Sequence, residues 1–535
     1  MTDNTTTPGD AESRVTSALS QLRRLLRRFD PTLLGLLGFL SLPAYVFDSL
    51  AFLELFSAFY IFFLWILVGP ILDMVLARGT GTETEPTDWI QAGGTRDLVV
   101  AYLMLPLTFL NPLTVTQDLL QLAGGAVAFV RNRGSLPDAG STDQQVSYRL
   151  PFEGTWTVVN GSPEREHSHS WIYPNQRYAY DFLITDETGA SRPEGSGTAL
   201  ERYYCYDEPV VAPADGVVVD TYDTALETSR GGGFSHPLKR DIRGSYVTIK
   251  HAESEYSTLA HLVPGSVAVE PGEQVRRGQQ IGRCGHSGNS SEPHLHFQVQ
   301  DHPEFAAAAS LPVQFDDVEI EYPGVTHEDD LVPGYDTWYA DETDPATDAR
   351  VGNEEPTGAP EGRHERTFII AGQRVTHADD GDPTEQHRTP AQAVADTQPA
   401  PAPVVSTGRA ITNTLKRAAF GIAVGGIVTF IAGLFTSGLT IAALLGGAGT
   451  VGVAFHYGFL LRSGDGFQFR PGWPGASLGL ALAAAAVGAA VVTGAVGTGT
   501  LTGLLLFAGV VGYAALATYD GRRLRSAVGR GAVAS

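Results

Sequence analysis

Long apolar runs at both ends of the chain, separated by a polar middle, limit what this sequence can fold into more than any other feature. Of the 535 residues, the apolar runs lie before about residue 131 and after about residue 417, and nearly all acidic residues lie between them. A run of about 20 apolar residues forms a helix long enough to cross a bilayer. The sequence therefore predicts a multi-domain chain, with a soluble domain inserted between two α-helical transmembrane blocks and the lipid bilayer as a partner.

The N-terminal block covers 31–130 and divides into candidate helices at 31–47 and 50–77 and a proline-broken region at 97–130. Proline disfavours a continuous helix, so this last region is either one kinked helix or a hairpin of two short ones. The C-terminal block covers 418–519. It predicts four glycine- and alanine-rich transmembrane helices, at 418–435, 438–461, 475–495 and 498–519.

Basic residues indicate which helix ends face the cytoplasm, because cytoplasmic loops carry an excess of Lys and Arg. Arginines gather in the tail 1–30 and in the basic tail 520–535, and Lys416 and Arg417 precede the first C-terminal helix. If region 97–130 is a hairpin, this rule places the soluble domain in the cytoplasm, whereas a single helix there places the domain outside. The first apolar run continues into the second without a small-residue cleavage site between them, so we expect the first helix to stay as an anchor of a multi-pass protein of the cell membrane.

Charge and cysteine content argue against two other classes of protein. The chain has 36 basic and 59 acidic residues and a formal net charge of −23. A nucleic-acid-binding protein needs a basic face for the phosphate backbone, so we expect no nucleic-acid partner. Cys205 and Cys284 are too few for a disulfide scaffold and lack CxxC spacing. A single bridge between them and two free thiols are both compatible with the sequence.

Residues 145–325 have the pattern of a β-rich globular domain. Apolar and polar residues alternate at 147–150, 155–159, 216–219 and 246–249, and Pro and Gly residues separate these runs. Alternation with a period of two is typical of strands with one buried face. We therefore expect several short strands joined by tight turns.

The segment 326–408 differs in composition from the rest of the middle block. It is rich in Asp, Glu, Thr, Pro and Ala and has few large apolar residues. A segment of this kind cannot bury enough apolar surface to offset the entropy lost on folding. We expect an acidic, largely disordered linker between the β-rich domain and the C-terminal helices.

Two histidines near the end of the β-rich domain indicate metal chemistry. His294 and His296 stand at i and i+2 beside Leu295, Phe297 and Val299, so on a strand both imidazoles would lie on one face. A catalytic zinc site takes about three protein ligands of nitrogen or oxygen type and leaves one position open for water. The pair therefore supplies part of a candidate metal site.

A series of motifs surrounds this pair. They are PVVAPADGVV at 209–218, GSYVTIKH at 244–251, YSTLAHL at 256–262, PGEQVRRGQQIG at 271–282 and GNSSEPHLHF at 288–297. Over about residues 150–315 the series resembles the lysostaphin-type (LytM-like, β-lytic) zinc metalloendopeptidases. The resemblance implies a small antiparallel β-sheet with a groove, a bound Zn2+, and hydrolysis of peptide bonds in the cell envelope by a zinc-activated water.

Matched position by position, the resemblance implies roles for four residues. Asp181 and His296 would be zinc ligands, and His261 and His294 would be the two active-site histidines that do not bind zinc. One neutral imidazole can take a proton from the activated water, and the other can stabilise the oxyanion and later protonate the leaving amine. The implied substrate is a peptide or a peptide-containing envelope polymer. The resemblance thus favours an extracellular domain, whereas the loop charges favour a cytoplasmic one.

The sequence departs from the family pattern at the first zinc ligand. The family places a histidine four residues before the aspartate, and here that position is Arg177, whose guanidinium stays charged and cannot bind a metal. We expect His169, which is nearer than His167, to return to the metal as the third ligand. The alternative is that this ligand is lost and the domain is a catalytically degenerate module that binds or regulates. A transporter regulated by the β domain is a third hypothesis, disfavoured because the expected spans contain no paired ionisable residues.

Overall fold

The computed structural model describes residues 31–45, 48–65, 68–69, 111–165, 168, 170–223, 226–233, 235–322, 361–378, 407–433, 436–462, 473–494 and 496–528. The chain divides into two compact units, and the first spans Met1–Glu85 and Val496–Gly503. This unit contains α2 (Thr32–Gly35) and the 3-10 helices η1 (Leu36–Tyr45) and η2 (Asp48–Leu64), and η1 packs against η2. The described parts of the regions expected at 31–47 and 50–77 are therefore helical.

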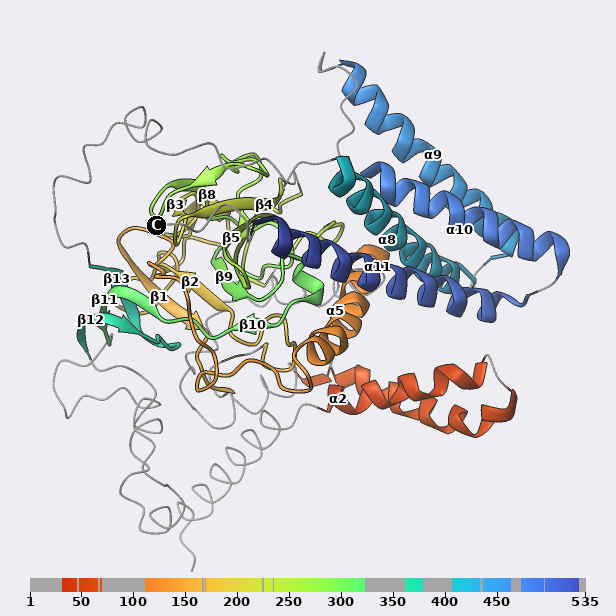
Figure 1. Cartoon of the computed structure of the whole chain (residues 1–535), viewed down its shortest axis with the longest axis horizontal. Helices are drawn as coiled ribbons and strands as arrows, with labels where there is room; N and C mark the ends of the chain where they lie inside the picture. The colour runs from red at the N-terminus through yellow and green to blue at the C-terminus, as the bar shows by residue number, and fades with distance from the viewer. Residues whose placement is uncertain are drawn as a thin grey trace, which may run out of the picture. The chain divides into compact units, whose positions relative to one another are not determined.

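The second unit spans Pro86–Ala495 and Leu504–Ser535 and contains the β strands and most of the helices (Figure 1). Within the described residues, its main sheet is antiparallel and has the strand order β12-β11-β13-β1-β2-β9-β6-β5-β4-β7, while β10 pairs with β9 and β3 pairs with β8 in a separate sheet. The strands are β1 (Thr155–Asn160), β2 (Tyr180–Leu183), β3 (Pro209–Val211), β4 (Gly216–Tyr222), β5 (Ser245–Ala252), β6 (Glu255–Leu262), β7 (Gln274–Val275), β8 (Gln280–Arg283), β9 (Leu295–Gln300), β10 (Ser310–Leu311), β11 (Phe315–Glu321), β12 (Gly362–Thr367) and β13 (Arg374–His377). The antiparallel β-sheet domain expected in the middle of the chain is confirmed.

Three of the runs with a period of two form strands of this sheet: 155–159 lies in β1, 216–219 in β4 and 246–249 in β5. The run at 147–150 makes only an isolated bridge to β11. Apolar side chains on one face of the strands form the core, and their removal from water is the dominant stabilising term. The fully buried side chains at the centre of the core include Val247, Ile249, Leu259, Leu295 and Phe297.

Residues 361–378 differ from the sequence expectation. Their composition predicted a disordered linker, but they form β12 and β13, and β13 pairs with both β1 and β11. The reason is local, because a short apolar run after β12 places Ile369 fully inside the core and Gly372 then turns the chain with a φ of 95°. An average over the surrounding acidic segment hides so short a run. The flanking stretches 323–360 and 379–406 lie outside the described residues.

One continuous helix, α5 (Pro112–Arg131), occupies the described part of the proline-broken region expected at 97–130. Asn111 caps it, because its side-chain oxygen accepts a hydrogen bond from the N–H of Leu113 at 3.0 Å, and proline holds the first helical position. The capping residue Asn111 therefore starts the helix at the second proline of the region, Pro112. The preceding stretch, 97–110, lies outside the described residues.

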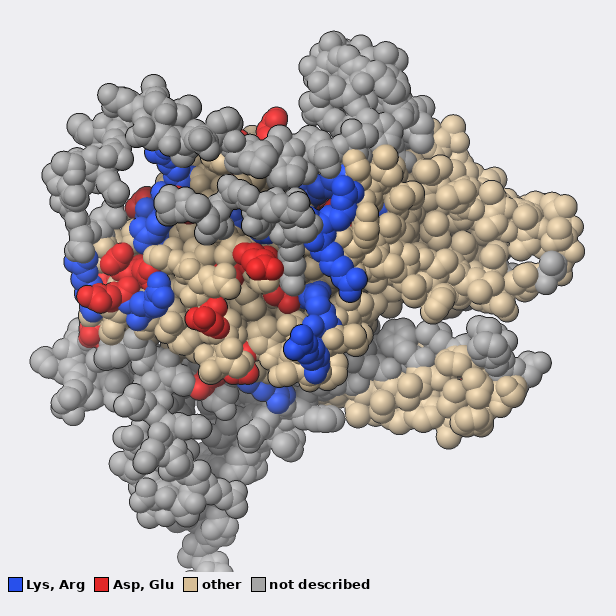
Figure 2. Space-filling view, in the orientation of Figure 1, with Lys and Arg blue, Asp and Glu red and all other residues tan. Residues whose placement is uncertain are grey.

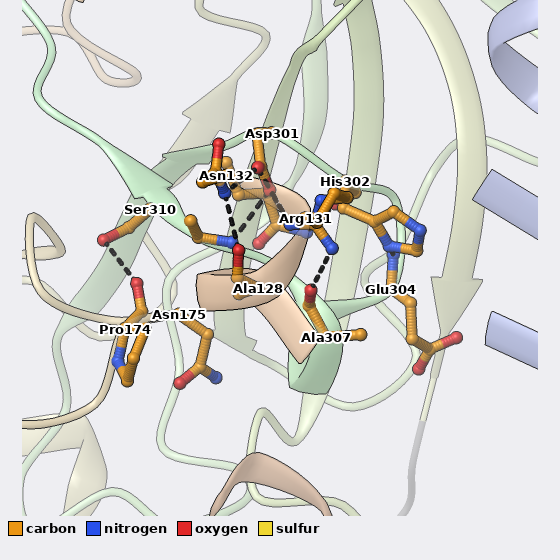
Figure 3. Close-up of polar contacts among 12 residues, drawn as sticks. Ala128, Arg131, Asn132, Pro174, Asn175, Asp301, His302, Glu304, Ala307 and Ser310 are labelled. Carbon is orange, nitrogen blue, oxygen red and sulfur yellow. Dashed lines mark hydrogen bonds and ion pairs between the residues drawn. The ribbon is translucent and has the colours of Figure 1, made fainter. Parts of the chain in front are cut away.

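Polar side chains attach α5 to the β-sheet domain at both ends and in the middle. Asn111 donates a hydrogen bond to the carbonyl oxygen of Lys239 at 3.0 Å, and Gln117 donates to a carbonyl of the same loop at 2.7 Å. At the other end of the helix, Nη2 of Arg131 donates to both carboxylate oxygens of Asp301 (Figure 3). The helix therefore lies along the domain over its whole length.

Four helices form the C-terminal part of the described chain: α8 (Thr407–Gly433), α9 (Gly438–Arg462), α10 (Trp473–Thr493) and α11 (Thr498–Val528). The described helices that are long and apolar enough to cross a membrane are Pro112–Arg131, Gly408–Gly433, Gly475–Thr493 and Gly499–Leu524. Figure 2 shows charged side chains gathered over the β-sheet domain, whereas most of the visible surface of the helices is uncharged. Along the chain, helices thus precede and follow the β-sheet domain, as the sequence predicts.

Helices α8 and α11 contact the domain through a buried polar cluster. Lys416 of α8 forms an ion pair with Glu304, and Tyr513 of α11 donates a hydrogen bond to the same carboxylate. Lys250 on β5 donates to the carbonyl oxygen of Leu524 at 3.4 Å. Burial acts to raise the pKa of Glu304, but the ammonium of Lys416 and the hydrogen bonds outweigh it and lower the pKa to about 2. The N-terminal half of α8 and the C-terminal end of α11 therefore lie against the domain.

Candidate active site

Three neighbouring strands of the main sheet position the expected site residues. Asp181 on β2 lies directly opposite His296 on β9, and His296 in turn lies opposite Ala260 on β6, the residue before His261. His294 comes just before β9 begins. Antiparallel pairing therefore brings together side chains that are more than 100 positions apart in the sequence.

Asp181 lies at the centre of the polar contacts in the site. Its Oδ1 is 2.9 Å from Nδ1 of His296 and 3.5 Å from Nε2 of His294, and its Oδ2 accepts a hydrogen bond from the side-chain amide of Asn160 at 3.0 Å. The residue is only 2% exposed. A buried carboxylate needs such partners because removing a charge from water is costly. The polar partners of Asp181 thus define a single buried site.

Main-chain carbonyls determine which nitrogen carries the proton in two of the imidazoles. Nδ1 of His294 lies 2.7 Å from the carbonyl oxygen of Glu292, and Nδ1 of His261 lies 2.8 Å from that of Ser287. A carbonyl oxygen only accepts, so Nδ1 is the protonated nitrogen in each neutral ring. Each Nε2 then holds a lone pair. The two rings, with centroids 4.7 Å apart, form a pair of candidate bases.

The backbone of His261 lies in the left-handed region, with a φ of 61°. This conformation costs a residue with a side chain roughly 1 kcal/mol or more, and it accompanies irregular pairing between β5 and β6 near Ser245 and Val247. The imidazole lies close to both other histidines, with ring centroids 4.7 Å from His294 and 5.7 Å from His296. The left-handed backbone at His261 therefore occurs at the residue whose ring lies beside the other two site histidines.

The surroundings shift the pKa values of two site histidines in opposite directions. Burial, together with the neighbouring His294 and His296, holds the pKa of His261 well below its ordinary value, so this ring is neutral. Burial also acts to lower the pKa of His296, but its hydrogen bond to Asp181 and the charge of that carboxylate outweigh burial and raise the pKa. The gap between His296 and Asp181 therefore favours a cation, which is either a proton or a metal ion.

The predicted zinc ligands fit this site in part. Asp181 and His296 direct a carboxylate oxygen and an imidazole nitrogen at one point, and both are ligand types that zinc takes. The third predicted ligand, His169, lies outside the described residues. Arg177 does not replace it, because its guanidinium lies over the ring of Trp171, 5.1 Å from the centroid. Among the residues that the structure describes, no three His, Cys, Asp or Glu side chains form a complete metal site.

Two residues of the site are not among those that the sequence predicts. Asn160 on β1 binds Asp181, and Gln298 on β9 places its Oε1 3.1 Å from Nε2 of His296. The sequence pattern could have identified Gln298, because the alternation that places His294 and His296 on one face of the strand continues to position 298. No sequence pattern marks Asn160, which reaches the site only because β1 pairs with β2.

The two cysteines are free thiols in the structure, and both are fully buried. The thiol of Cys205 donates a hydrogen bond to the carbonyl oxygen of Pro293 at 3.1 Å, next to His294. Burial raises the pKa of the Cys284 thiol well above its ordinary value. Of the two interpretations left open by the sequence, the structure corresponds to free thiols, and buried neutral thiols are poor nucleophiles.

The β-sheet domain matches a known family of peptidases. Residues 203–306 match the model described as Peptidase family M23. This range includes His261, His294 and His296, while Asp181 lies outside it. The resemblance to lysostaphin-type peptidases is therefore confirmed for this domain.

The curated relatives match part of the chain. The peptidoglycan DD-endopeptidase ShyA of Vibrio cholerae serotype O1 is 34% identical over 190 residues, which cover 35% of this chain and 35% of ShyA. The cell division protein DipM of Caulobacter vibrioides is 38% identical over 60 residues, which cover 11% of this chain and 10% of DipM. The chain therefore spans about a third, or less, of the length of these relatives.

Solved structures of peptidases also match the chain. A zinc-containing peptidase from Vibrio cholerae is 23% identical, with a TM-score of 0.20, and the match covers 32% of this chain and 41% of that one. The catalytic domain of lysostaphin from Staphylococcus simulans is 18% identical, with a TM-score of 0.17, and the match covers 31% of this chain and 88% of that one.

Proposed function

We propose that the β-sheet domain, whose residues 203–306 match peptidase family M23, is a zinc metalloendopeptidase that hydrolyses peptide bonds. The observation that best supports this function is the convergence of Asp181, His261, His294 and His296. Metal-assisted amide hydrolysis needs metal ligands of this type beside neutral bases. The two imidazoles with lone pairs on Nε2 are such bases.

Each of these side chains has a part in the proposed mechanism. Asp181 and His296, with His169 as the proposed third ligand, would hold the zinc ion. When bound, zinc supplies Lewis-acid chemistry that brings the pKa of water toward neutrality. Nε2 of His294 takes the proton of the attacking water, and the neutral ring of His261 can share that proton. The protonated member of the pair then stabilises the oxyanion and donates the proton to the leaving amine.

We propose short peptides of small residues as the substrate class. The relative ShyA is named as a peptidoglycan DD-endopeptidase, and peptidoglycan peptides belong to this chemical class. Small residues also suit a site whose four central side chains are all 7% exposed or less, because little space is open above them. Glycine- and alanine-containing peptides are therefore the first compounds to test.

Zinc content and peptide hydrolysis by the full chain in detergent test this function. We expect about one zinc per chain and cleavage of glycine- or alanine-containing peptides. His296→Ala and Asp181→Ala should lose both the metal and the activity. His294→Ala should keep the metal and lose only the activity, because His294 is a proposed base and not a ligand. His169→Ala should lose zinc if this residue is the third ligand.

His364→Gln is the matched control for these variants. His364 lies on β12 at the far edge of the main sheet, so this variant removes an imidazole without touching the site. It should keep both the zinc and the activity. Retention of full activity in His294→Ala would contradict the proposed mechanism, and retention of zinc in His296→Ala would contradict the proposed ligand set.

A second candidate function is a degenerate module that binds peptides without cleaving them. The observation that favours it is Arg177, which stands at the family's first ligand position and lies over Trp171 instead of facing Asp181. Wild-type protein that binds small-residue peptides but holds no zinc would support this second function. Zinc bound in a ratio of about one per chain, together with hydrolysis, would exclude it.

We further propose that α8 to α11 span a cell membrane and that α5 does not. Hydrogen bonds and an ion pair tie α5 to the domain at Asn111, Gln117 and Arg131, which leaves no part of its length free to cross a bilayer. Lys416 lies against Glu304 of the domain, so the basic helix ends and the domain share one side. The excess of Lys and Arg on cytoplasmic segments makes this side the cytoplasm, and the substrate is then a cytoplasmic peptide.

A further inference from the structure

Two buried amides continue the active-site face of β9 beyond the histidines. Gln298 and Gln300 follow His296 at alternate positions, so all three side chains lie on the same face of the strand. Neither glutamine has any exposed surface. Burying an amide costs free energy unless its donors and its acceptor find partners. The partners of these two amides therefore determine how each one is oriented.

One main-chain carbonyl fixes the orientation of Gln298. Nε2 of Gln298 lies 2.7 Å from the carbonyl oxygen of Asn175 and 2.6 Å from Oε1 of Gln300. A main-chain carbonyl only accepts, so the NH2 group of Gln298 faces Asn175 and its Oε1 faces the opposite way. There Oε1 lies 3.1 Å from Nε2 of His296. Because Oε1 also only accepts, Nε2 of His296 is a protonated nitrogen.

A second main-chain carbonyl fixes the next amide in the same way. Nε2 of Gln300 donates to the carbonyl oxygen of His302 at 2.7 Å. Its Oε1 therefore points back along the strand, where it accepts from Gln298 and, at 3.3 Å, from the hydroxyl of Thr258. Reversing either amide would place two acceptors or two donors against each other. The hydrogen bonds from His296 to His302 therefore all run in one direction. Each side chain donates to the next residue of the series, and the last acceptor is the carbonyl oxygen of His302.

The segment that presents the Asn175 carbonyl is itself held in place. The side-chain amide of Asn175 donates to Gln121 of α5 at 3.1 Å. The preceding carbonyl, that of Pro174, accepts from the hydroxyl of Ser310 at 3.2 Å, as Figure 3 shows. The group that orients Gln298 is thus attached both to α5 and to β10.

We propose that Gln298 is a positioning residue for His296. By accepting the hydrogen bond from Nε2–H, Gln298 makes Nδ1, which lies 2.9 Å from Asp181, the nitrogen that shares a proton with this carboxylate or gives that proton up to bind a metal ion in its place. This proposal rests on the proposed zinc site, because a lone pair on Nδ1 is what a metal ion held there would need. Partners that fix a metal-binding imidazole in this way typically change metal affinity by about 10- to 100-fold.

Zinc affinity of the full chain in detergent, measured by competition with a chromogenic chelator, tests this role. Gln298→Met keeps much of the side-chain volume and removes the acceptor, and we expect it to weaken zinc binding by about 10- to 100-fold. Gln298→Glu keeps an acceptor toward Nε2 of His296 but places its second oxygen against the carbonyl of Asn175, so it should bind zinc more tightly than Gln298→Met and less tightly than wild type. Gln298→Asn, which is too short to reach Nε2, is a second loss variant in case Gln298→Met does not fold.

Gln300→Met is the matched control. It removes the next amide of the same row but leaves the bonds of Gln298 to His296 and Asn175 in place, so we expect little change in zinc affinity. Thermal unfolding of the zinc-free variants shows whether each one folds. Equal zinc affinity in Gln298→Met and wild type, or equal losses in the two methionine variants, would overturn the positioning role while the zinc site stands. A wild-type chain that binds no zinc would overturn both this role and the proposed function.

Discussion

Nη2 of Arg131, the last residue of α5, donates to both carboxylate oxygens of Asp301, the residue after β9, at 2.6 and 2.8 Å. Asp301 also accepts from the N–H of Ala309 at 2.8 Å, and Arg131 donates to the carbonyl of Ala307 at 2.7 Å. The two side chains are 9% and 18% exposed. This pair therefore joins α5 to the end of the strand that carries His296.

Asp301→Asn should destabilise the fold, because it leaves the charge of Arg131 largely buried without a carboxylate. Removing one partner of such a pair costs about 3 kcal/mol, which thermal unfolding in detergent would detect as a lower transition temperature. Asp207→Asn is the control, since its pair with Arg283 is 53% and 40% exposed and exposed pairs contribute about 0–1 kcal/mol. Equal shifts in the two variants would contradict the structural role of the Arg131 pair.

Gly521 marks a place where α11 meets the domain without space for a side chain. A Cβ at Gly521 would lie 1.9 Å from Nε2 of His302, so Gly521→Ala must displace the helix or the ring, at a cost of about 1–3 kcal/mol. On the same helix, a Cβ at Gly503 would meet open space. Gly503→Ala should therefore be neutral or stabilise by up to about 1 kcal/mol. Unfolding temperatures that move in the same direction in both variants would contradict this contact.

Stability should fall in acid partly because of His302. Burial lowers the pKa of His302 to about 4, and Arg131 and Lys416 act in the same direction, while Asp301 and Glu304 oppose them. The unfolded chain, with an ordinary histidine pKa near 6.5, binds the proton first. Stability is therefore lost as the pH falls from about 6.5 to about 4, by on the order of 3 kcal/mol.

The measurement for His302 is the unfolding temperature at several pH values in that interval. His302→Asn keeps an acceptor for the N–H of Glu304, which His302 binds through Nδ1 at 3.1 Å, and it cannot be protonated. The difference between wild type and His302→Asn should therefore shrink or reverse as the pH falls. A difference that does not depend on pH would show that protonation of His302 does not affect folding.

Local sequence patterns predicted the strands better than average composition predicted disorder. The alternation at 155–159 and 246–249 identified β1 and β5, because a period of two reports one buried face directly, and the valine run at 216–219 identified β4. β12 and β13 were missed, since their few buried residues, such as Ile369, lie in an acidic background. The partners of β13 are β1 and β11, and no feature of the strand's own sequence specifies them.

The motifs predicted which side chains meet in the site but not how each is held. Asp181 and His296 lie opposite each other, as motif order implied. The protonated nitrogen of His294 depends on the carbonyl of Glu292, and the aim of His261 depends on a left-handed backbone. Carbonyl directions and backbone angles are set by the packed fold, so sequence spacing does not report them.

Labelling of added cysteines with a membrane-impermeant maleimide can test on which side of the membrane the domain lies. Both native thiols are fully buried, so the reagent should not reach them. Thr188→Cys adds a thiol to an exposed loop of the β-sheet domain, and Ser437→Cys adds one at an exposed position between α8 and α9. Helix α8 separates Ser437 from Lys416, which pairs with the domain. The two added thiols should therefore lie on opposite sides of the membrane.

With a cytoplasmic domain, Thr188→Cys is protected in intact cells and is labelled only after the membrane is permeabilised, whereas Ser437→Cys is labelled in intact cells. The reverse pattern would place the domain outside, contradict the topology inferred from Lys416 and the other basic residues, and make envelope peptides accessible to the site. Identical labelling of both variants would show that α8 does not cross the membrane. The labelling of Thr188→Cys therefore decides on which side of the membrane the substrate must lie, independently of the zinc measurements.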